Sequence, residues 1–270
     1  MVTPLLSTMV KKRMRAMSML LERGTRLKRS CIGVFALLSL LILFSYAPKE
    51  VRAQSGQSSD DWQFAAEIYV WGASVGGETS TGSDIDVDFD DLLSDLDLGF
   101  MGAVGAKKDK WGIIADVIYL DVSDGTTLDS GVRVNGELTG WIFHPIVTYN
   151  LVDSDRLDLN VLAGARYLYL EPGVEEVGVT RVSESSSYWD GIAGFRGRVL
   201  LSDKWYLPYH LDIGAGNSDF TWQALGGIGY RFKWFDLSLA YRYLSWDFDD
   251  DEATKDLNLH GPFAGFIFHF

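Results

Sequence analysis

Apolar and polar residues alternate with a period of two along most of the chain after residue 60. In the stretch 235–247, one face carries Phe235, Leu237, Leu239, Tyr241 and Tyr243, and the other carries Asp236, Ser238, Ala240 and Arg242. The stretches 157–170 and 220–232 alternate in the same way. A period of two is the signature of β-strands that present two different faces, so the pattern predicts sheet.

Strand-like stretches follow one another from residue 62 to the last residue. About ten are predicted, at 62–72, 96–107, 111–122, 132–149, 157–170, 188–201, 205–215, 220–232, 235–247 and 257–270. Merging or splitting stretches would make the number eight or twelve. Proline removes a ladder hydrogen bond, so His144-Pro145 predicts a bulge or an edge and leaves the strand register open there.

The connections between these stretches alternate in length. Short polar turns at 107–110, 153–155, 202–204 and 233–234 alternate with mostly longer segments at 73–95, 123–131, 171–187 and 248–256, and 216–219 is a short exception. Short periplasmic turns and longer external loops are typical of transmembrane barrels. An even number of strands places both ends of the barrel at the periplasmic rim.

Aromatic residues gather near the ends of the predicted strands. They are Trp62, Phe64, Trp111, Tyr149, Tyr167, Tyr169, Trp205, Tyr230, Phe232, Phe235, Tyr241, Tyr243, Phe268 and Phe270. Aromatic girdles flank the lipid-facing band of membrane barrels. We therefore predict an all-β fold, an antiparallel up-and-down transmembrane β-barrel of about ten strands. A soluble sandwich or lipocalin-like barrel has the same periodicity and is the alternative.

The first fifty or so residues differ in composition from the rest. Basic residues between Lys11 and Arg29 precede an apolar run at 31–47 and the sequence Val51-Arg52-Ala53. These are the parts of a secretory signal peptide. We predict a signal-peptide helix at 1–53 that is cleaved near Ala53, a flexible lead-in at 54–61 and a barrel at 62–270. An uncleaved anchor helix is the alternative, and a later methionine would serve equally as the start.

Charge and cysteine content narrow the function classes. Without residues 1–53 the chain has 14 basic and 35 acidic residues, a net charge near −21. A chain this acidic is not expected to bind nucleic acid through its phosphates. The single cysteine, Cys31, lies in the predicted signal peptide and lacks a lipobox. We expect no disulfide, lipid anchor, thiolate metal site or cofactor in the mature chain.

The last predicted strand, Gly265-Phe266-Ile267-Phe268-His269-Phe270, resembles the C-terminal insertion signal of outer-membrane barrels. Gly265, Phe268 and Phe270 carry the likeness, and Phe263 departs from it because a polar residue is usual there. The stretches 62–72 and 111–120 are similar to strands of small, mostly uncharacterised OmpA/OmpW-like barrels. The resemblance implies an outer-membrane location, with membrane lipids, lipopolysaccharide and the barrel-assembly machinery as partners.

If the aromatic face contacts lipid, the opposite face lines the barrel interior. The charged residues assigned to it are Glu67, Asp116, Arg166, Asp190, Arg196, Arg198, His210, Asp212, Arg231 and Arg242. Buried charges need partners, and about ten strands enclose far less space than a 16-stranded porin. We predict a salt-bridged core that largely plugs the interior, leaving at most a narrow path for an ion or small molecule. A conducting or catalytic interior is the alternative.

Two further groups of residues are candidates for chemistry. Carboxylates at Asp84, Asp86, Asp88, Asp90 and Asp91 lack the glycine and glutamate of an EF-hand. They are a candidate for a weak divalent-cation site bridging lipopolysaccharide phosphates, against a merely solvated loop. His210 and Asp212 are a candidate acid–base pair, but no constellation of nucleophile, histidine and carboxylate is evident.

We therefore expect a non-enzymatic outer-membrane barrel with a structural or narrow-channel role. An OmpW-like pore for small apolar molecules is one alternative, and a lateral opening in the wall would distinguish it. An outer-membrane hydrolase is another, and Asp and His residues clustered at the outer rim would distinguish it. A third is an adhesin or cation-binding surface protein that acts through 73–95 and 171–187.

Overall fold

The computed structural model describes residues 61–80, 82, 84–127, 133–176, 181–183, 185–249 and 254–270. The predicted signal peptide at 1–53 and the lead-in up to residue 60 lie outside the described residues. In the described part of the chain, no helix is long and apolar enough to cross a bilayer.

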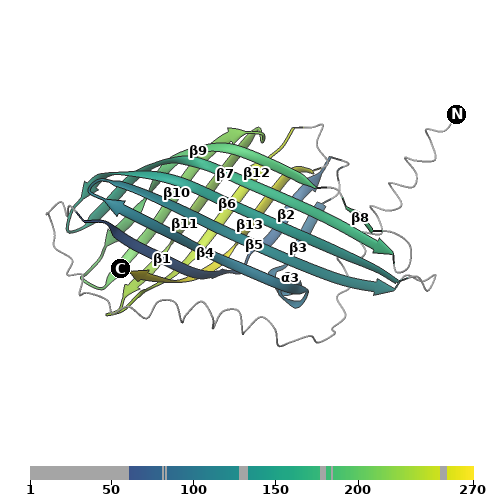
Figure 1. Ribbon diagram of the computed structural model, residues 1–270, viewed down its shortest axis with the longest axis horizontal. Coiled ribbons are helices and arrows are strands. Elements are labelled where there is room, and N and C mark those ends of the chain that lie inside the picture. The colour runs from purple at the N-terminus through teal and green to yellow at the C-terminus, as the bar shows by residue number, and fades with distance from the viewer. Residues whose placement is uncertain are drawn as a thin grey trace.

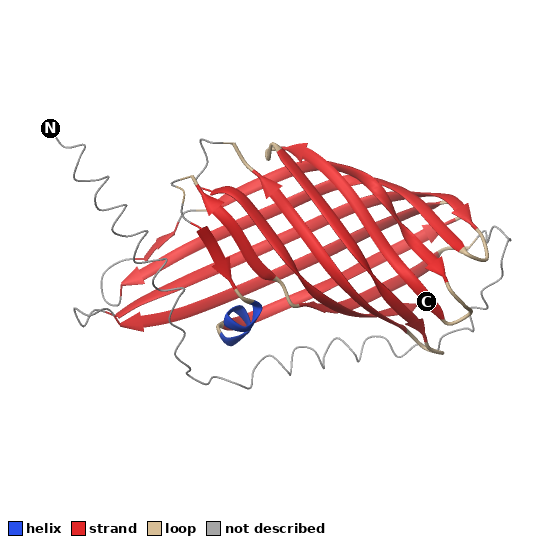
Figure 2. Cartoon of the chain, turned by 180° about the vertical axis from the view of Figure 1, so that it is seen from behind, coloured by secondary structure: helices blue, strands red, loops and turns tan. Residues whose placement is uncertain are grey.

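Ten long antiparallel strands form the wall (Figures 1 and 2). They are β1 (Gln63–Trp71), β4 (Leu96–Lys108), β5 (Trp111–Thr127), β6 (Arg133–Asp153), β7 (Leu157–Glu176), β9 (Ser186–Leu200), β10 (Trp205–Gly216), β11 (Phe220–Arg231), β12 (Asp236–Asp247) and β13 (Thr254–His269). Each of these strands pairs with the next in the series, and β1 pairs with β13, which closes the wall. The predicted ten-stranded up-and-down barrel is confirmed.

The two rims of the barrel differ. Ala65 near the start of β1 pairs with His269 at the end of β13, so both ends of the barrel lie at one rim. Short turns join the strands at this rim, including one where Asp109 adopts a φ of 53°, a left-handed conformation that aspartate tolerates. We call this the inner rim, and the opposite one the outer rim.

Short elements lie at the outer rim, within the segments predicted as loops. They are β2 (Ser74–Thr79), β3 (Asp84–Val87), the helix α3 (Phe89–Ser94) and β8 (Arg181–Ser183). β2 continues the path of β1 along β13, β3 pairs with β2, and β8 pairs with β7. The sequence did not predict these strands, because they form by hydrogen bonding to edges that the longer strands leave open.

Two wall strands, β5 and β7, run well beyond their predicted ends toward the outer rim. β5 continues to Thr127, which pairs with Arg133 of β6, and β7 continues to Glu176, which pairs with Val134. The polar composition of these ends indicated loops, but continued pairing satisfies their backbone groups better than a loop would. In Figure 1 they project beyond the rest of the wall.

Pro145 interrupts one ladder without shifting it. The β6–β7 pairing omits residues 144 and 145, yet Phe143/Tyr167 and Ile146/Gly164 keep one register. The predicted bulge or edge at this site is therefore wrong, and the register shift falls between Asn150 and Val152 instead. Gly164 explains the continuity: a Cβ there would lie 2.2 Å from the Pro145 carbonyl oxygen, so only glycine lets the strands stay this close.

Candidate functional site

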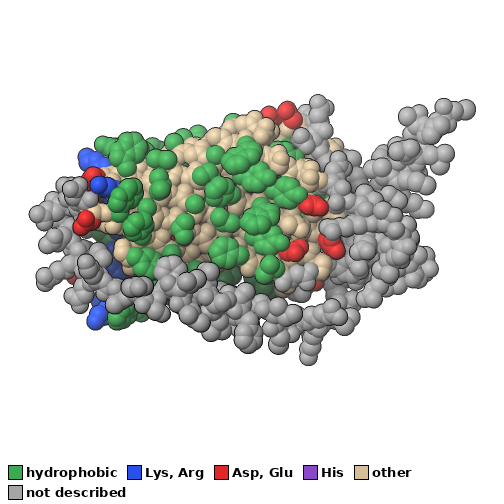
Figure 3. All heavy atoms as spheres, in the orientation of Figure 1, with side chains coloured by type: hydrophobic (Ala, Val, Ile, Leu, Met, Phe, Trp, Pro, Cys, Tyr) green, Lys and Arg blue, Asp and Glu red, His purple; other side chains and the backbone are tan. Residues whose placement is uncertain are grey.

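The outer surface of the barrel carries an apolar belt. Exposed residues on it include Ile68, Val104, Ile113, Val147, Phe195, Leu211, Ile213, Ile228, Leu239 and Phe266. Figure 3 shows hydrophobic side chains spread over the middle of the visible face, with charged side chains toward the two ends. A soluble protein rarely exposes so continuous an apolar surface, whereas lipid contact requires one.

Aromatic pairs mark two levels that bound this belt. The inner level has Trp111–Tyr149 and Trp205–Tyr230, and the outer level has Tyr119–Trp141, Tyr167–Trp189 and Trp222–Tyr243. On β5, Trp111 and Tyr119 stand eight positions apart. Eight residues of a strand tilted by about 40° rise about 20 Å, close to the height of about 25 Å of a lipid-facing band. The wall is therefore built to cross a bilayer.

Arg166 on β7 is the first node of a polar network inside the barrel, and its side chain is completely buried. Its Nε donates to His144 Nε2 at 2.9 Å, and its Nη1 donates to Thr221 Oγ1 at 2.7 Å. Its Nη2 donates to Asp212 Oδ1 at 2.6 Å. Every nitrogen of this guanidinium therefore has a partner. The other oxygen of Asp212 lies 2.6 Å from His210 Nε2.

Arg242 on β12 is the second node. Its Nη2 donates to Asp116 Oδ2 at 3.2 Å and to Gln223 Oε1 at 2.7 Å. Its Nη1 donates to the Tyr69 hydroxyl at 3.3 Å, and that hydroxyl donates to Asp116 Oδ1 at 2.5 Å. Asp116 therefore receives bonds on both oxygens, which is the arrangement that a buried carboxylate needs.

His144 on β6 joins the two nodes. Its Nε2 accepts from Arg166, so in the neutral ring the proton sits on Nδ1, which lies 3.3 Å from Asp116 Oδ2. Arg242 and Asp116 meet although β13, β1 and β4 separate their strands in the wall. One connected set of hydrogen bonds therefore crosses the lumen.

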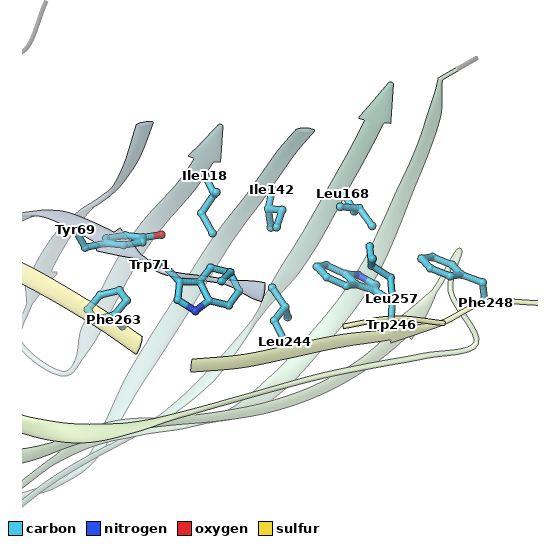
Figure 4. Packing of buried hydrophobic residues seen from close by; sticks show 11 residues of the cluster. Tyr69, Trp71, Ile118, Ile142, Leu168, Leu244, Trp246, Phe248, Leu257 and Phe263 are labelled. Atoms are coloured by element: carbon cyan, nitrogen blue, oxygen red, sulfur yellow. The ribbon is translucent and has the colours of Figure 1, made fainter. Parts of the chain in front are cut away.

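An apolar cluster fills the lumen on the outer side of this network (Figure 4). Its buried members are Tyr69, Trp71, Ala73, Ile118, Ile142, Leu168, Leu244, Trp246, Phe248, Leu257 and Phe263. The Arg242 guanidinium lies 4.8 Å from the centre of the Trp71 ring, and that of Arg166 lies 5.9 Å from the Trp246 ring. Two layers of side chains thus lie across the lumen, with cation–π contacts between them.

The strand registers place the ten charged residues predicted for the interior on the lumen side. The network unites Asp116, Arg166, His210, Asp212 and Arg242. The rest lie outside it: Arg198 Nε is 3.6 Å from Asp158 Oδ2, Asp190 accepts from the Ser218 N–H, Arg231 donates to the Asp203 carbonyl, and Glu67 and Arg196 line a cavity.

Sequence reasoning missed several network residues and the whole apolar layer. His144 was not assigned to the interior, although it alternates in phase with the buried Ile142 and Ile146. Leu244 and Trp246 follow Arg242 in the same phase, so they also point inward. The expectation of a polar interior held only for the inner part of the lumen, because close packing lets apolar side chains fill a narrow barrel equally well.

The predicted cation-binding residues do not form a single loop. Asp84 and Asp86 lie on β3, Asp90 and Asp91 lie in α3, and Asp88 lies between the two elements. Within the described ranges, no group of three or more His, Cys, Asp or Glu side chains is placed to hold a metal ion. The divalent-cation site stays a prediction without an assembled set of ligands.

The residues of the C-terminal insertion signal lie at the inner end of β13. Phe268 packs 6.2 Å from Phe235, and Phe270 is exposed. Gly265 leaves room for Glu67, whose Oε1 would lie 2.6 Å from a Cβ at that position. Phe263, the departure from the signal, points inward and its ring centre lies 4.6 Å from that of Tyr69. Phe263 belongs to the apolar cluster, which explains why an apolar residue stands where the insertion signal usually has a polar one.

No family model matches the chain, and no curated protein matches it significantly. Solved structures similar to it include the attachment invasion locus protein Ail of Yersinia pestis, at 10% identity and a TM-score of 0.38, covering 77% of this chain and 98% of that one. The outer membrane protease OmpT of Escherichia coli has 11% identity, a TM-score of 0.46 and coverage of 80% and 99%.

The toluene transporter TodX of P. putida has 10% identity, a TM-score of 0.28 and coverage of 78% and 90%. These neighbours are outer-membrane β-barrels, as the resemblance of the sequence implies. At such low identity their individual roles say nothing about this chain, so its activity has to be argued from its own residues.

Proposed function

We propose that this chain is a non-catalytic outer-membrane β-barrel with a structural role, and that it conducts only when the lumen network opens. The observation that carries the proposal is a pair of side-chain layers across the lumen, the Arg166–His144–Asp116–Arg242 network and the apolar cluster beyond it. A general porin would need an open path, whereas a closed barrel keeps the membrane tight.

The histidines support the absence of catalysis. His144 Nε2 accepts from Arg166 and therefore has no free lone pair with which to take a proton from a substrate. His210, the candidate base, bonds Asp212, and within the described residues no hydrogen bond joins it to a serine, threonine or cysteine. The pair also lies deep in the lumen rather than at the outer rim, where a large substrate could reach it.

The proposal includes export and assembly. The signal peptide would be removed near Ala53, and the barrel-assembly machinery would recognise the end of β13 through Gly265, Phe268 and Phe270. In the membrane the apolar belt would contact lipid, and the outer rim would meet lipopolysaccharide. The net charge near −21 of the remaining chain argues against nucleic acid as a partner.

The test is expression with the signal in a Gram-negative host, purification from outer membranes and recording of current across planar bilayers. A change in gel mobility on boiling establishes the folded barrel. Wild type should be closed most of the time, and Arg242→Ala should raise the open fraction several-fold because it frees Asp116 and Gln223. Arg231→Ala at the inner rim is the control and should behave as wild type. A wide, constantly open pore in wild type would overturn the proposal.

A second candidate, a pore that admits small apolar molecules through the wall, is favoured by the seam between β1 and β4. Their ladder ends at Ile68/Gly102, and farther out the Trp71 N–H donates to Met101 Sδ at 3.2 Å. β4 thus lacks a strand partner on this side from Leu96 to Met101 within the described chain. Behind the seam lies the apolar cluster, which could receive an apolar solute from the lipid.

The helix α3 lies at the outer end of this seam, because it ends at Ser94 and β4 begins at Leu96. The Phe89 N–H of this helix donates to Ser74 Oγ at 3.3 Å. The Phe89 ring lies over Gly72, where an added Cβ would be 3.4 Å from it. Cross-linking Ile68→Cys to Gly102→Cys with a short bis-maleimide should lower uptake of labelled toluene by cells if the seam is the route. A matched pair on the same face, Ala106 and Ile113, partners across β4 and β5, should have no effect. Equal uptake in all variants would exclude the lateral route.

A further inference from the structure

A cavity of about 140 Å³ lies in the lumen on the inner side of the network. Its lining includes Glu67, Arg196, His210, Gln223 and Ser238, together with the inner faces of Asp116 and Arg242. In liquid water, about four to five water molecules occupy this volume. The cavity therefore has room for a molecule of about five non-hydrogen atoms.

Glu67 and Arg196, two residues of opposite formal charge, both line this cavity without a direct contact between them. Glu67 projects from β1 and Arg196 from β9, and four wall strands separate β1 from β9 in either direction around the barrel. Neither side chain has a hydrogen bond or ion pair with any other side chain in the part of the chain that the structure describes.

This pair differs from the other charges of the lumen. Arg166 contacts Asp212 at 2.6 Å, Arg242 contacts Asp116 at 3.2 Å and Arg198 lies 3.6 Å from Asp158. Enclosed charges without direct partners are costly, and the cost is removed when something bonded to both fills the space between them. The filler must present an acceptor to Arg196 and a donor to Glu67.

We propose that the cavity binds a compact zwitterion of amino-acid type. Its carboxylate would bond the Arg196 guanidinium, whose planar fork suits a carboxylate, and its ammonium would bond Glu67. The Ser238 hydroxyl supplies a further hydrogen-bonding group in the lining. A simple anion would leave Glu67 without a partner, and a simple cation would leave Arg196 without one, so neither satisfies the site.

The proposal rests on the proposed function, because it names the class of solute that reaches the lumen from the inner rim. The polar network would stop this solute from passing farther in the closed state. Conductance of Arg242→Ala tests the closure, and ligand binding tests the cavity, so the two can fail separately. If Arg242→Ala conducts but the cavity binds no zwitterion, only the present inference is lost.

Calorimetric titration of the full chain, processed by the host and purified from outer membranes, tests the site with glycine, acetate and methylammonium. Glycine should bind, and the other two should bind at least about tenfold more weakly, because each lacks one charge-assisted hydrogen bond. No binding of glycine would mean that water alone fills the cavity and would overturn the proposal. Equal binding of acetate would overturn it in favour of an anion site.

Matched variants test the residues. Glu67→Gln and Arg196→Gln should each weaken glycine binding at least about tenfold, whereas Arg198→Gln, outside the cavity lining, should leave it unchanged. Equal losses of glycine affinity in all three variants would overturn the assignment of Glu67 and Arg196 to the binding site. If Glu67→Gln and Arg196→Gln fail the boiling test for a folded barrel, the wild-type protein still decides. Glycine should slow the modification of Arg196 by phenylglyoxal, which peptide mass spectrometry follows. An unchanged rate of modification would overturn the proposal.

Discussion

Arg166 and Arg198 both point into the lumen, but their surroundings differ. The Arg166 side chain is completely buried, with three partners between 2.6 and 2.9 Å. That of Arg198 is 35% exposed and lies 3.6 Å from Asp158. A charge removed from a buried network leaves its partners uncompensated, whereas water replaces a partner at a half-exposed pair. The stability of the barrel should therefore depend on the first arginine far more than on the second.

Arg166→Ala should lower the free energy of unfolding by about 3–5 kcal/mol, because Asp212 loses its cation inside the lumen. Arg198→Ala should lower it by about 0–1 kcal/mol. Urea unfolding in detergent micelles, followed by tryptophan fluorescence, measures both. Similar losses in the two variants would show that the network is no more important than a surface ion pair.

Glycines in the wall also differ in the space around them. A Cβ at Gly164 would lie 2.2 Å from the Pro145 carbonyl oxygen, whereas a Cβ at Gly226 would meet nothing within 4 Å. Gly164→Ala should therefore force β6 and β7 apart and sharply reduce the fraction of chains that show the mobility shift on boiling. Gly226→Ala should fold as wild type does, since alanine suits a strand at least as well as glycine. Normal folding of Gly164→Ala would refute the close approach.

At the scale of elements, the seams of the wall are unequal. β5 and β6 pair without interruption from Trp111/Tyr149 to Thr127/Arg133. β1 and β4 pair only from Gln63/Lys107 to Ile68/Gly102. Unpaired backbone groups near lipid are costly, so the outer part of β4 is the place where the wall opens most easily.

Hydrogen exchange should reveal this difference. Amides of β4 that face β1 should exchange faster between residues 96 and 101 than between 103 and 107, where the ladder is intact. Two-dimensional NMR of the barrel in micelles measures each amide, and amides that face β5 serve as internal controls. Uniform protection along β4 would show that the seam is closed over its whole length.

At the scale of the molecule, the apolar belt requires lipid. Leu239 is 50% exposed on β12 and lies midway between Phe235 and Tyr243. Phe235 stacks on Phe232, which contacts Tyr230 of the inner level, and Tyr243 belongs to the outer level. An arginine near the middle of a lipid-facing band costs about 2–4 kcal/mol, and one near an interface costs about 0–1 kcal/mol. A soluble barrel would tolerate arginine at either depth.

Leu239→Arg should therefore destabilise the barrel in lipid vesicles by about 2–4 kcal/mol, and Trp234→Arg, in a turn at the inner rim, by about 0–1 kcal/mol. The free energy of unfolding in urea gives both values. If Leu239→Arg costs no more than Trp234→Arg, the belt does not face the hydrocarbon core, and the barrel does not cross the membrane at this depth.

The sequence by itself determined the strands, their outward faces and the contrast between the rims, because alternation and turn residues are local properties. The positions of Leu239 and Tyr243 on the lipid side, and of Arg242 on the other, could be read in this way. The interior ion pairs could not. Arg242 and Asp116 belong to strands far apart in the chain, and only closure of the wall and its register bring them together.

The tertiary structure also decided that Leu244 and Trp246 pack inside the lumen and that Glu67 and Arg196 line one cavity. An apolar residue on either face of a strand looks the same in the sequence, since both lipid and a packed lumen accept it. Which face is filled depends on the width of the barrel and on the side chains from the opposite wall. That information appears only when strands distant in the sequence are placed around one axis.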